Sequence, residues 1–181
     1  MHRTVTTPTD LTGEALEDLK SWLGISRPKD DTTLVSLLEA SLALCEAFTG
    51  QTPIEQTIEE RIPPMAGHYS LATRPVRAAL TAEMLDAFGV RTTIPADHFT
   101  VNIDADSRAF VSLAKDIEGQ AVAVSLRAGI ASDWASLPGA LKQGIIRLAA
   151  FHYNDRESVK DAKPPASVTA LWRPWRIVRL T

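Results

Sequence analysis

The sequence predicts an α+β fold, mainly α: a bundle of about three to four helices, an inserted small antiparallel β region and an extended C-terminal arm. Three observations support this prediction. Leucine-rich stretches with helical spacing lie on both sides of a middle segment, the middle is rich in proline, glycine and β-branched residues, and an aromatic, basic stretch ends the chain. We expect a single domain over residues 1–159, helical at 10–50 and 136–157 with the β region at 52–134, and a separate arm at 160–181.

Helical spacing is clearest in the first fifty residues. Thr9-Asp10 or Thr12 can cap a first helix, whose apolar residues run up to a stop at Gly24. The pair Asp30-Asp31 supplies a cap and negative charge for a longer second helix, and Gly50 ends it in a left-handed conformation. The apolar stripe of this second helix comprises Leu34, Leu37, Leu38, Leu42, Cys45 and Phe48.

In the middle of the chain the apolar residues no longer have helical spacing, and short runs there predict strands. Four short runs alternate or are β-branched, which predicts a small antiparallel sheet. These runs are Thr57–Ile62, Phe99–Ile103, Ala109–Leu113 and Ala121–Leu126. The segment Ala78–Phe88 stays open, because its apolar spacing suits a short helix whereas its position after Pro75-Val76 also suits a strand.

A third helix opens at Ser136-Leu137-Pro138, since proline near the first helical position loses no hydrogen bond. Its inner stripe contains Leu141, Ile145, Leu148, Ala149 and His152. Gly144 inside this helix costs about 1 kcal/mol against alanine. It either allows another helix to approach closely or is merely tolerated.

Composition excludes several classes of function. With 19 basic against 22 acidic residues, the net charge of −3 does not favour wrapping nucleic acid or binding an anionic membrane. Cys45 is the only cysteine, so no internal disulfide or thiolate metal cluster can form, and it reads as a small buried hydrophobe. No apolar run approaches the roughly 20 residues that span a bilayer, and the N-terminus lacks a signal-peptide core, so we expect a soluble, unexported protein.

Catalytic and metal-binding patterns find little support. The four histidines are dispersed, and the pair His152 and Asp155, although spaced i, i+3, has no third ligand pattern beside it. No phosphate-binding glycine loop, nucleophile elbow or zinc-protease motif occurs. The carboxylate pairs Glu59-Glu60 and Asp104/Asp106 read as solvated surface. We therefore expect no enzyme activity, no cofactor and no metal.

The C-terminal stretch is different. Residues 160–181 contain five basic and one acidic residue, a local charge of +4 that leaves −7 for residues 1–159. Tryptophan and arginine are the residue types most enriched as anchors at protein interfaces. The candidate docking residues are Leu171, Trp172, Arg173, Trp175, Arg176, Ile177 and Arg179. Two alternatives stay open: the stretch folds back over its own domain, or its arginines and tryptophans bind nucleic acid, which the acidic body would oppose.

Two groups of motifs resemble the tailed-phage head-to-tail connector (adaptor) family, which includes the adaptors of gene transfer agents. The first group is the short helix ending Leu19–Ile25, the cap Asp30–Leu34 and the helix close Glu46–Gly50. The second is the strand end Val124–Gly129, the proline-started helix Leu137–Ile145 and the close Tyr153–Glu157. Together they cover roughly a third of the chain in the order that the family has. The sequence departs from the family at Leu126-Arg127 and in the tail, where the family usually has a leucine-rich stretch.

The resemblance implies a structural role in a virion or phage-like particle. About a dozen copies would form a ring under the portal protein, line the channel through which DNA leaves the head, and receive a tail-side connector or stopper protein on the lower face. Assembly would take place in the host cytoplasm, with the C-terminal arm docked on the portal and no membrane involved. Two other readings remain: a cytoplasmic helical scaffold or interaction module with no virion role, and an enzyme built around His98 or His152.

Overall fold

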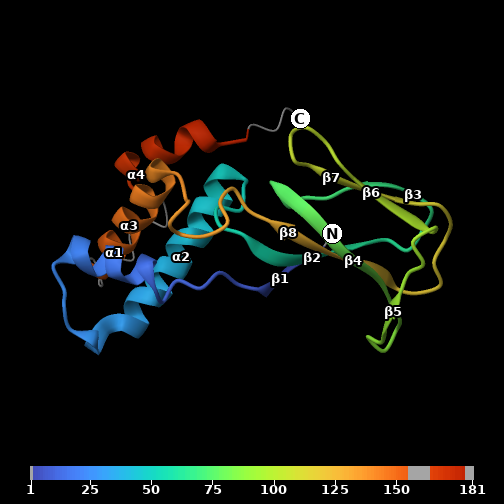
Figure 1. Cartoon of the computed structure of the whole chain (residues 1–181), viewed down its shortest axis with the longest axis horizontal. Helices are drawn as coiled ribbons and strands as arrows, with labels where there is room; N and C mark the ends of the chain where they lie inside the picture. Colours follow the sequence, from blue (N-terminus) through green and yellow to red (C-terminus); the bar gives the residue numbers. More distant parts are fainter. Residues whose placement is uncertain (1, 155–163, 178–181) are drawn as a thin grey trace. The chain divides into compact units, whose positions relative to one another are not determined.

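The computed structural model describes residues 2–154 and 164–177 and divides into two compact units. The β unit combines Met1–Pro8 with Glu55–Gly129, and the helical unit combines Thr9–Ile54 with Ile130–Thr181. Helices and strands thus segregate in space although they alternate along the chain (Figure 1). The predicted α+β class is confirmed, with a larger share of strand than "mainly α" implies.

The helical unit is built on the packing of two long helices. Its elements are α1 (Glu14–Leu23), the 3₁₀ turn η1 (Pro28–Asp30), α2 (Asp31–Thr49), α3 (Gly139–Asn154), α4 (Ala166–Trp172) and the 3₁₀ turn η2 (Arg173–Trp175). Helix α3 contacts α1, α2 and α4, so it forms the centre of the unit (Figure 1). The predicted apolar stripes form its core, which contains Leu19, Leu34, Leu38, Cys45, Leu141, Ile145 and Leu148. Each fully buried leucine stabilises the unit by about 1.5–3 kcal/mol.

Helix α1 ends where the sequence predicts but begins differently. Gly24 and Gly50 terminate α1 and α2 with φ angles of 68° and 72°, the left-handed region that favours glycine. The predicted cap from Asp10 or Thr12 is wrong, because Gly13 occupies the N-cap position. Asp10 instead accepts hydrogen bonds from the backbone N–H and hydroxyl of Thr12, at 2.8 and 2.7 Å. It orders the turn before the helix.

The pair Asp30-Asp31 marks the start of α2 as predicted but makes no capping hydrogen bond from a side chain. The hydroxyl of Tyr153 donates to Asp30 Oδ2 at 3.0 Å, which ties the start of α2 to the last turn of α3. Lys20 Nζ lies 3.0 Å from Asp31 Oδ1, and the hydrogen bond to this carboxylate raises the pKa of Lys20. The two carboxylates therefore connect α2 to its neighbouring helices.

One stretch, Pro28–Thr49, is long and apolar enough by length and composition to cross a membrane. The sequence expectation missed it because polar residues interrupt every continuous apolar run in it. Its leucines at positions 34 and 38 are completely buried in the helical unit. Core helices of globular proteins can have the same composition. Only 28% of the apolar window of this stretch is buried, so packing in the helical unit accounts for its inner face and leaves other apolar side chains of α2 partly exposed.

The β unit contains two antiparallel sheets. Its strands are β1 (His2–Thr7), β2 (Gln56–Ile62), β3 (Gly67–Ser70), β4 (Val76–Leu85), β5 (Arg91–Thr93), β6 (Phe99–Ile103), β7 (Ala109–Leu113) and β8 (Ala121–Ala128). The five-stranded sheet has the order β1-β2-β8-β4-β5, and the three-stranded sheet has the order β3-β7-β6. The core of the unit includes Ile58, Ile62, Val111, Val122, Val124 and Leu126. All four predicted strands are present, so the antiparallel β region is confirmed.

Strand β4 settles the segment that the sequence left open between helix and strand. Its register with β8 shifts twice, between Val76 and Ala78 and again between Ala79 and Thr81. Each irregularity breaks the alternation of apolar and polar residues, which is why the pattern of period two was blurred in the sequence. Strand β1 was missed for another reason: it is an edge strand whose six residues are all exposed, so it shows no apolar alternation.

Candidate docking surfaces

The C-terminal segment folds onto its own unit, which corrects the prediction of an extended arm for residues 164–177. Helix α4 starts after Pro165 and packs on α3. The Trp172 indole is completely buried, and its Nε1–H points at the carbonyl oxygen of Leu141 at 3.4 Å. Trp172 also lies against Gly144: a Cβ at position 144 would come within 2.8 Å of its ring atoms. Of the two readings of Gly144, the structure supports close helix approach.

The end of the segment lies along the C-terminal end of α2. The Ile177 backbone N–H donates to the Thr49 carbonyl at 2.9 Å, and the Gln51 side-chain amide donates to the Trp175 carbonyl. The Arg176 guanidinium lies 5.6 Å from the centre of the Phe48 ring, a cation–π arrangement. Backbone and side-chain contacts thus hold the turn η2 in one position on the helical unit.

The predicted docking residues therefore fall into groups. Trp172 is a core residue, as the fold-back alternative requires. Leu171, Trp175 and Ile177 are half-buried, and Arg173 and Arg176 are exposed. Arg179 lies outside the described residues. We define the η2 surface as Arg173, Trp175, Arg176 and Ile177; it presents two cations beside partly covered apolar side chains.

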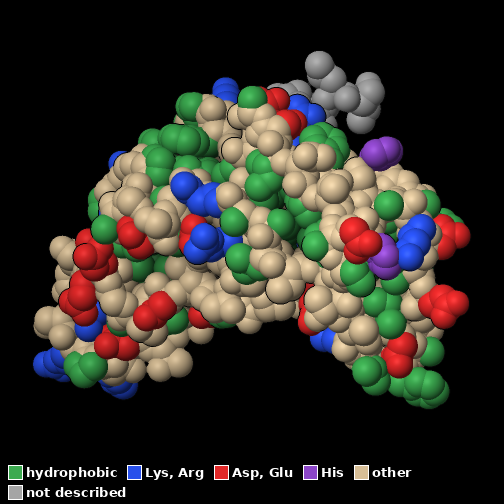
Figure 2. Space-filling view, turned by 45° about the vertical axis from the view of Figure 1, so that its right-hand side comes forward, with side chains coloured by type: hydrophobic (Ala, Val, Ile, Leu, Met, Phe, Trp, Pro, Cys, Tyr) green, Lys and Arg blue, Asp and Glu red, His purple; other side chains and the backbone are tan. Residues whose placement is uncertain are grey.

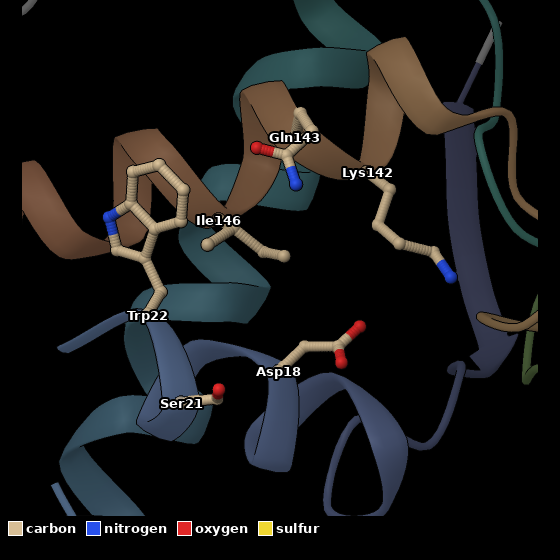
Figure 3. A pocket seen from close by; sticks show the side chains of 6 residues that line it. All are labelled: Asp18, Ser21, Trp22, Lys142, Gln143 and Ile146. Carbon is tan, nitrogen blue, oxygen red and sulfur yellow. The ribbon is translucent and has the colours of Figure 1, made fainter. Parts of the chain in front are cut away.

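A second surface feature, which the sequence analysis missed, is a cleft between α1 and α3 of about 400 Å³. Its lining residues are Asp18, Ser21, Trp22, Lys142, Gln143 and Ile146. Figure 3 shows the Trp22 indole beside Ile146, with the Asp18 carboxylate and the Lys142 ammonium group facing the other part of the cleft. Trp22 is 51% exposed, and the guanidinium of Arg147 lies 5.6 Å from its ring centre.

The cleft has ordered polar walls. Trp134 Nε1 donates to Asp18 Oδ2 at 2.9 Å, which fixes the carboxylate on α1. Lys142 Nζ lies 5.5 Å from the centre of the same Trp134 ring. Trp22 follows Leu16 and Leu19 at helical spacing, but the two leucines are buried whereas Trp22 is not. The sequence signal for this cleft was a tryptophan at the end of the first helix, in addition to the leucines that form its buried stripe.

The carboxylate pair on β2 is not solvated surface, which corrects the sequence reading. Glu60 is fully buried and accepts hydrogen bonds from the backbone N–H groups of Ala72 and Thr73, at 2.9 and 2.6 Å. Glu59 is 3% exposed and lies 2.8 Å from Arg91 Nη1 and 3.1 Å from Arg61 Nε. Burial alone would raise the pKa of Glu59, but hydrogen bonds from Arg91 and Arg61 outweigh it and lower the pKa.

The other titratable candidates have ordinary surroundings. Asp104 accepts hydrogen bonds from the backbone N–H groups of Asp106 and Arg108 in an exposed turn. The half-buried His98 lies 3.7 Å from the exposed Asp97. Among the described residues, no three histidine, cysteine, aspartate or glutamate side chains gather closely enough to hold a metal ion. The candidate pair of His152 with Asp155 falls partly outside the described residues. The surfaces with a distinctive arrangement are therefore η2 and the α1–α3 cleft.

No protein-family model and no curated protein matches the sequence, but solved structures match the whole fold. One is a chain in the neck of an empty gene transfer agent particle computed with C6 symmetry, with a TM-score of 0.79 and 24% identity. Others are chains of the virion of a native gene transfer agent particle, with a TM-score of 0.78 and 25% identity, and of the native neck computed with C12 symmetry, with a TM-score of 0.78 and 26% identity. Each match covers 100% of this chain and 98% of the other.

The fold defines a class: similarity over the whole chain to chains of particle necks supports a structural subunit of the neck or connector type. The resemblance to the head-to-tail connector family, with its gene transfer agent adaptors, is confirmed.

Proposed function

We propose that this protein is the adaptor subunit of a phage or gene transfer agent particle, in which about a dozen copies form a ring between portal and tail. The observation that carries the proposal is the end-to-end correspondence with neck chains, one of them in a structure computed with C12 symmetry. A partial match would support a shared domain only. A match over 100% of one chain and 98% of the other supports the same part in the same kind of assembly.

The portal contact that we propose uses the η2 surface. Arg173 and Arg176 place two guanidinium groups beside the half-buried Trp175, a combination enriched among interface anchors. The turn is held by hydrogen bonds to the end of α2, so little conformational entropy remains to be lost on binding. Trp172 is buried and Leu171 half-buried in the unit that carries this surface, and Arg179, outside the described residues, is a further candidate for the portal contact.

We propose that DNA passes through the ring without binding strongly to its subunits. Phosphate affinity comes from lysine and arginine side chains that can release counterions. On the five-stranded sheet, Arg61 and Arg91 are engaged by Glu59, and Arg91 also contacts Glu83 at 2.9 Å. Such paired cations contribute little to phosphate binding, and the whole chain carries a charge of −3. The role is structural and requires neither a cofactor nor a catalytic group.

Portal attachment tests the docking surface. The double variant Arg173→Glu/Arg176→Glu should lower co-sedimentation with purified portal at least tenfold, because two cations at the contact become anions. The matched control is Arg27→Glu/Lys29→Glu, which reverses two exposed charges between α1 and α2 and should bind as the wild type does. Thermal unfolding of each variant verifies the fold. Equal attachment of all three proteins contradicts the role of the η2 surface.

Electron microscopy of the portal complex tests the ring itself. Rings on the portal whose averaged images have twelve-fold symmetry support the adaptor role. A chain that stays monomeric beside the portal would instead support the stand-alone scaffold.

A further inference from the structure

The hairpin between β4 and β5 presents an apolar tip that nothing in its own unit covers. Phe88 is 92% exposed and Val90 is 59% exposed. In Figure 2, hydrophobic atoms gather at the lower right of the β unit, at the height where the β4–β5 hairpin of Figure 1 ends. Single exposed apolar residues are common, but two of them on one turn, separated only by Gly89, form a small apolar surface. We call this surface the knob.

The knob has a fixed shape. Asp86 Oδ1 accepts hydrogen bonds from the backbone N–H groups of Phe88 and Val90, both at 2.8 Å. The Asp86 N–H donates to the Val90 carbonyl at 3.1 Å, and Gly89 takes the positive φ of 81° that the turn requires. The Phe88 ring is therefore presented on an ordered turn that carries one negative charge, so binding would order few additional bonds.

The α1–α3 cleft has the size and chemistry to receive this knob. A cavity of about 150 Å³ is enough to hold a benzene molecule, whereas the cleft measures about 400 Å³. Trp22 and Ile146 supply an apolar and aromatic wall, and aromatic pairs favour offset or edge-to-face contact. Lys142 lines the cleft and Arg147 lies over Trp22, so two cations are available for the carboxylate of Asp86.

Ring symmetry explains why one chain would carry both a knob and a cleft. In a cyclic assembly of more than two copies, each subunit contacts its neighbours through two different patches, one on each side. The hairpin lies in the β unit and the cleft in the helical unit, so the two are distinct patches on every copy. Their shapes are convex and concave. The knob carries the Asp86 carboxylate, and the cleft region carries two cations, Lys142 and Arg147, against one carboxylate, Asp18.

We infer that, in the ring proposed above, the Phe88 hairpin of each copy inserts into the α1–α3 cleft of the next copy. This inference rests on the proposed adaptor function for the existence of the ring. The inference adds the lateral contact between neighbouring copies that closes the ring. Phe88 is the anchor of this contact, and Asp86 pairs with Lys142 and Arg147 to orient it. Removing a buried aromatic anchor of this kind weakens an interface by roughly tenfold to thirtyfold.

Cross-linking of the full chain assembled on its portal tests the contact. The double variant Ala87→Cys/Gln143→Cys keeps Phe88 and places thiols on the exposed knob and in the cleft, whereas native Cys45 is buried and does not compete. A short bifunctional maleimide should give a ladder of covalent oligomers, and a mixture of the two single variants should stop at dimers. The matched control Ala87→Cys/Glu39→Cys keeps the knob thiol and moves the other to the exposed Glu39 of α2, and should give no ladder.

The outcomes separate the two proposals. Rings that form and give the ladder support the contact, and Phe88→Ala should then lower ring formation at least tenfold while leaving the melting temperature unchanged. Rings that form without a ladder, or that tolerate Phe88→Ala, overturn the knob-and-cleft contact and leave the adaptor function standing. Absence of rings from wild-type protein on the portal overturns both.

Discussion

The Trp172 indole lies directly against Gly144, the residue on α3 that leaves room for it. This contact brings α4 onto α3 and makes the C-terminal segment part of the core of the helical unit. It also explains a glycine inside a helix, which by itself costs about 1 kcal/mol relative to alanine. The loss of helix propensity is offset by the burial of Trp172, the largest of the fully buried side chains that the structure describes.

Substitution of Gly144 by alanine should destabilise the protein. Alanine is the better helix former, but its Cβ would lie within 2.8 Å of atoms in the Trp172 ring and force the indole out of place. We expect a loss of about 1–3 kcal/mol in the free energy of unfolding, the usual cost of overpacking. Urea denaturation measures it. Gly139→Ala is the control, because no atom lies within 4 Å of a Cβ there, and it should be neutral or stabilising.

Removal of the Trp172 side chain should be more damaging. Trp172→Ala leaves a large cavity against α3 and Phe48, and such truncations cost about 3–5 kcal/mol. A chain that ends before Ala170 should behave similarly and expose apolar surface, which light scattering would detect as aggregation. A truncated protein that melts as the full chain does would show that the segment is a dispensable arm after all.

The Glu59 ion pairs give stability that depends on pH. The pKa of Glu59 is lowered in the folded protein, so its contribution is fully present above the ordinary value of 4.5 and is lost as the pH falls through the lower folded value. Glu59→Gln should therefore reduce the free energy of unfolding by about 1–3 kcal/mol at pH 7. The difference from wild type should shrink below pH 4, and urea titrations at both pH values would reveal it. Asp106→Asn, at an exposed turn, serves as the control.

Native Cys45 should resist thiol reagents. Burial raises the pKa of its thiol to about 12, and the nearby Glu46 carboxylate adds to this effect. Since only the thiolate reacts, labelling by a chromogenic disulfide at pH 8 should be slow in buffer and rapid in denaturing urea. Fast labelling of the folded chain would mean that α2 opens locally.

Much of the fold could be predicted because local patterns and packing agree. Helical periodicity alone predicted the leucine stripe of α2 and its end at Gly50. An alternating apolar run predicted β8. Strand β1 could not be predicted, because an exposed edge strand is specified by its partner β2 and not by its own residues.

The candidate sites were harder to predict than the fold. The basic, tryptophan- and arginine-rich composition of the C-terminal stretch suggested a docking arm, yet Val168 and Trp172 have the i, i+4 spacing of a buried helical face. The cleft beside Trp22 depends on the angle at which α1 and α3 meet, which no local pattern in one sequence encodes. Glu60 was misassigned because its partners are backbone N–H groups twelve and thirteen residues away.

The β segment leaves and re-enters the helical unit at neighbouring points. Ile54 and Ala131 form a parallel bridge, and the Ile130 N–H donates to the Thr52 carbonyl at 2.9 Å. The residues between these positions therefore join the helical unit at a single place, where the outgoing and returning segments contact each other. A shorter or differently shaped β segment could be inserted between these two positions while the helices keep their hydrogen bonds, provided that it still offers a partner strand to β1.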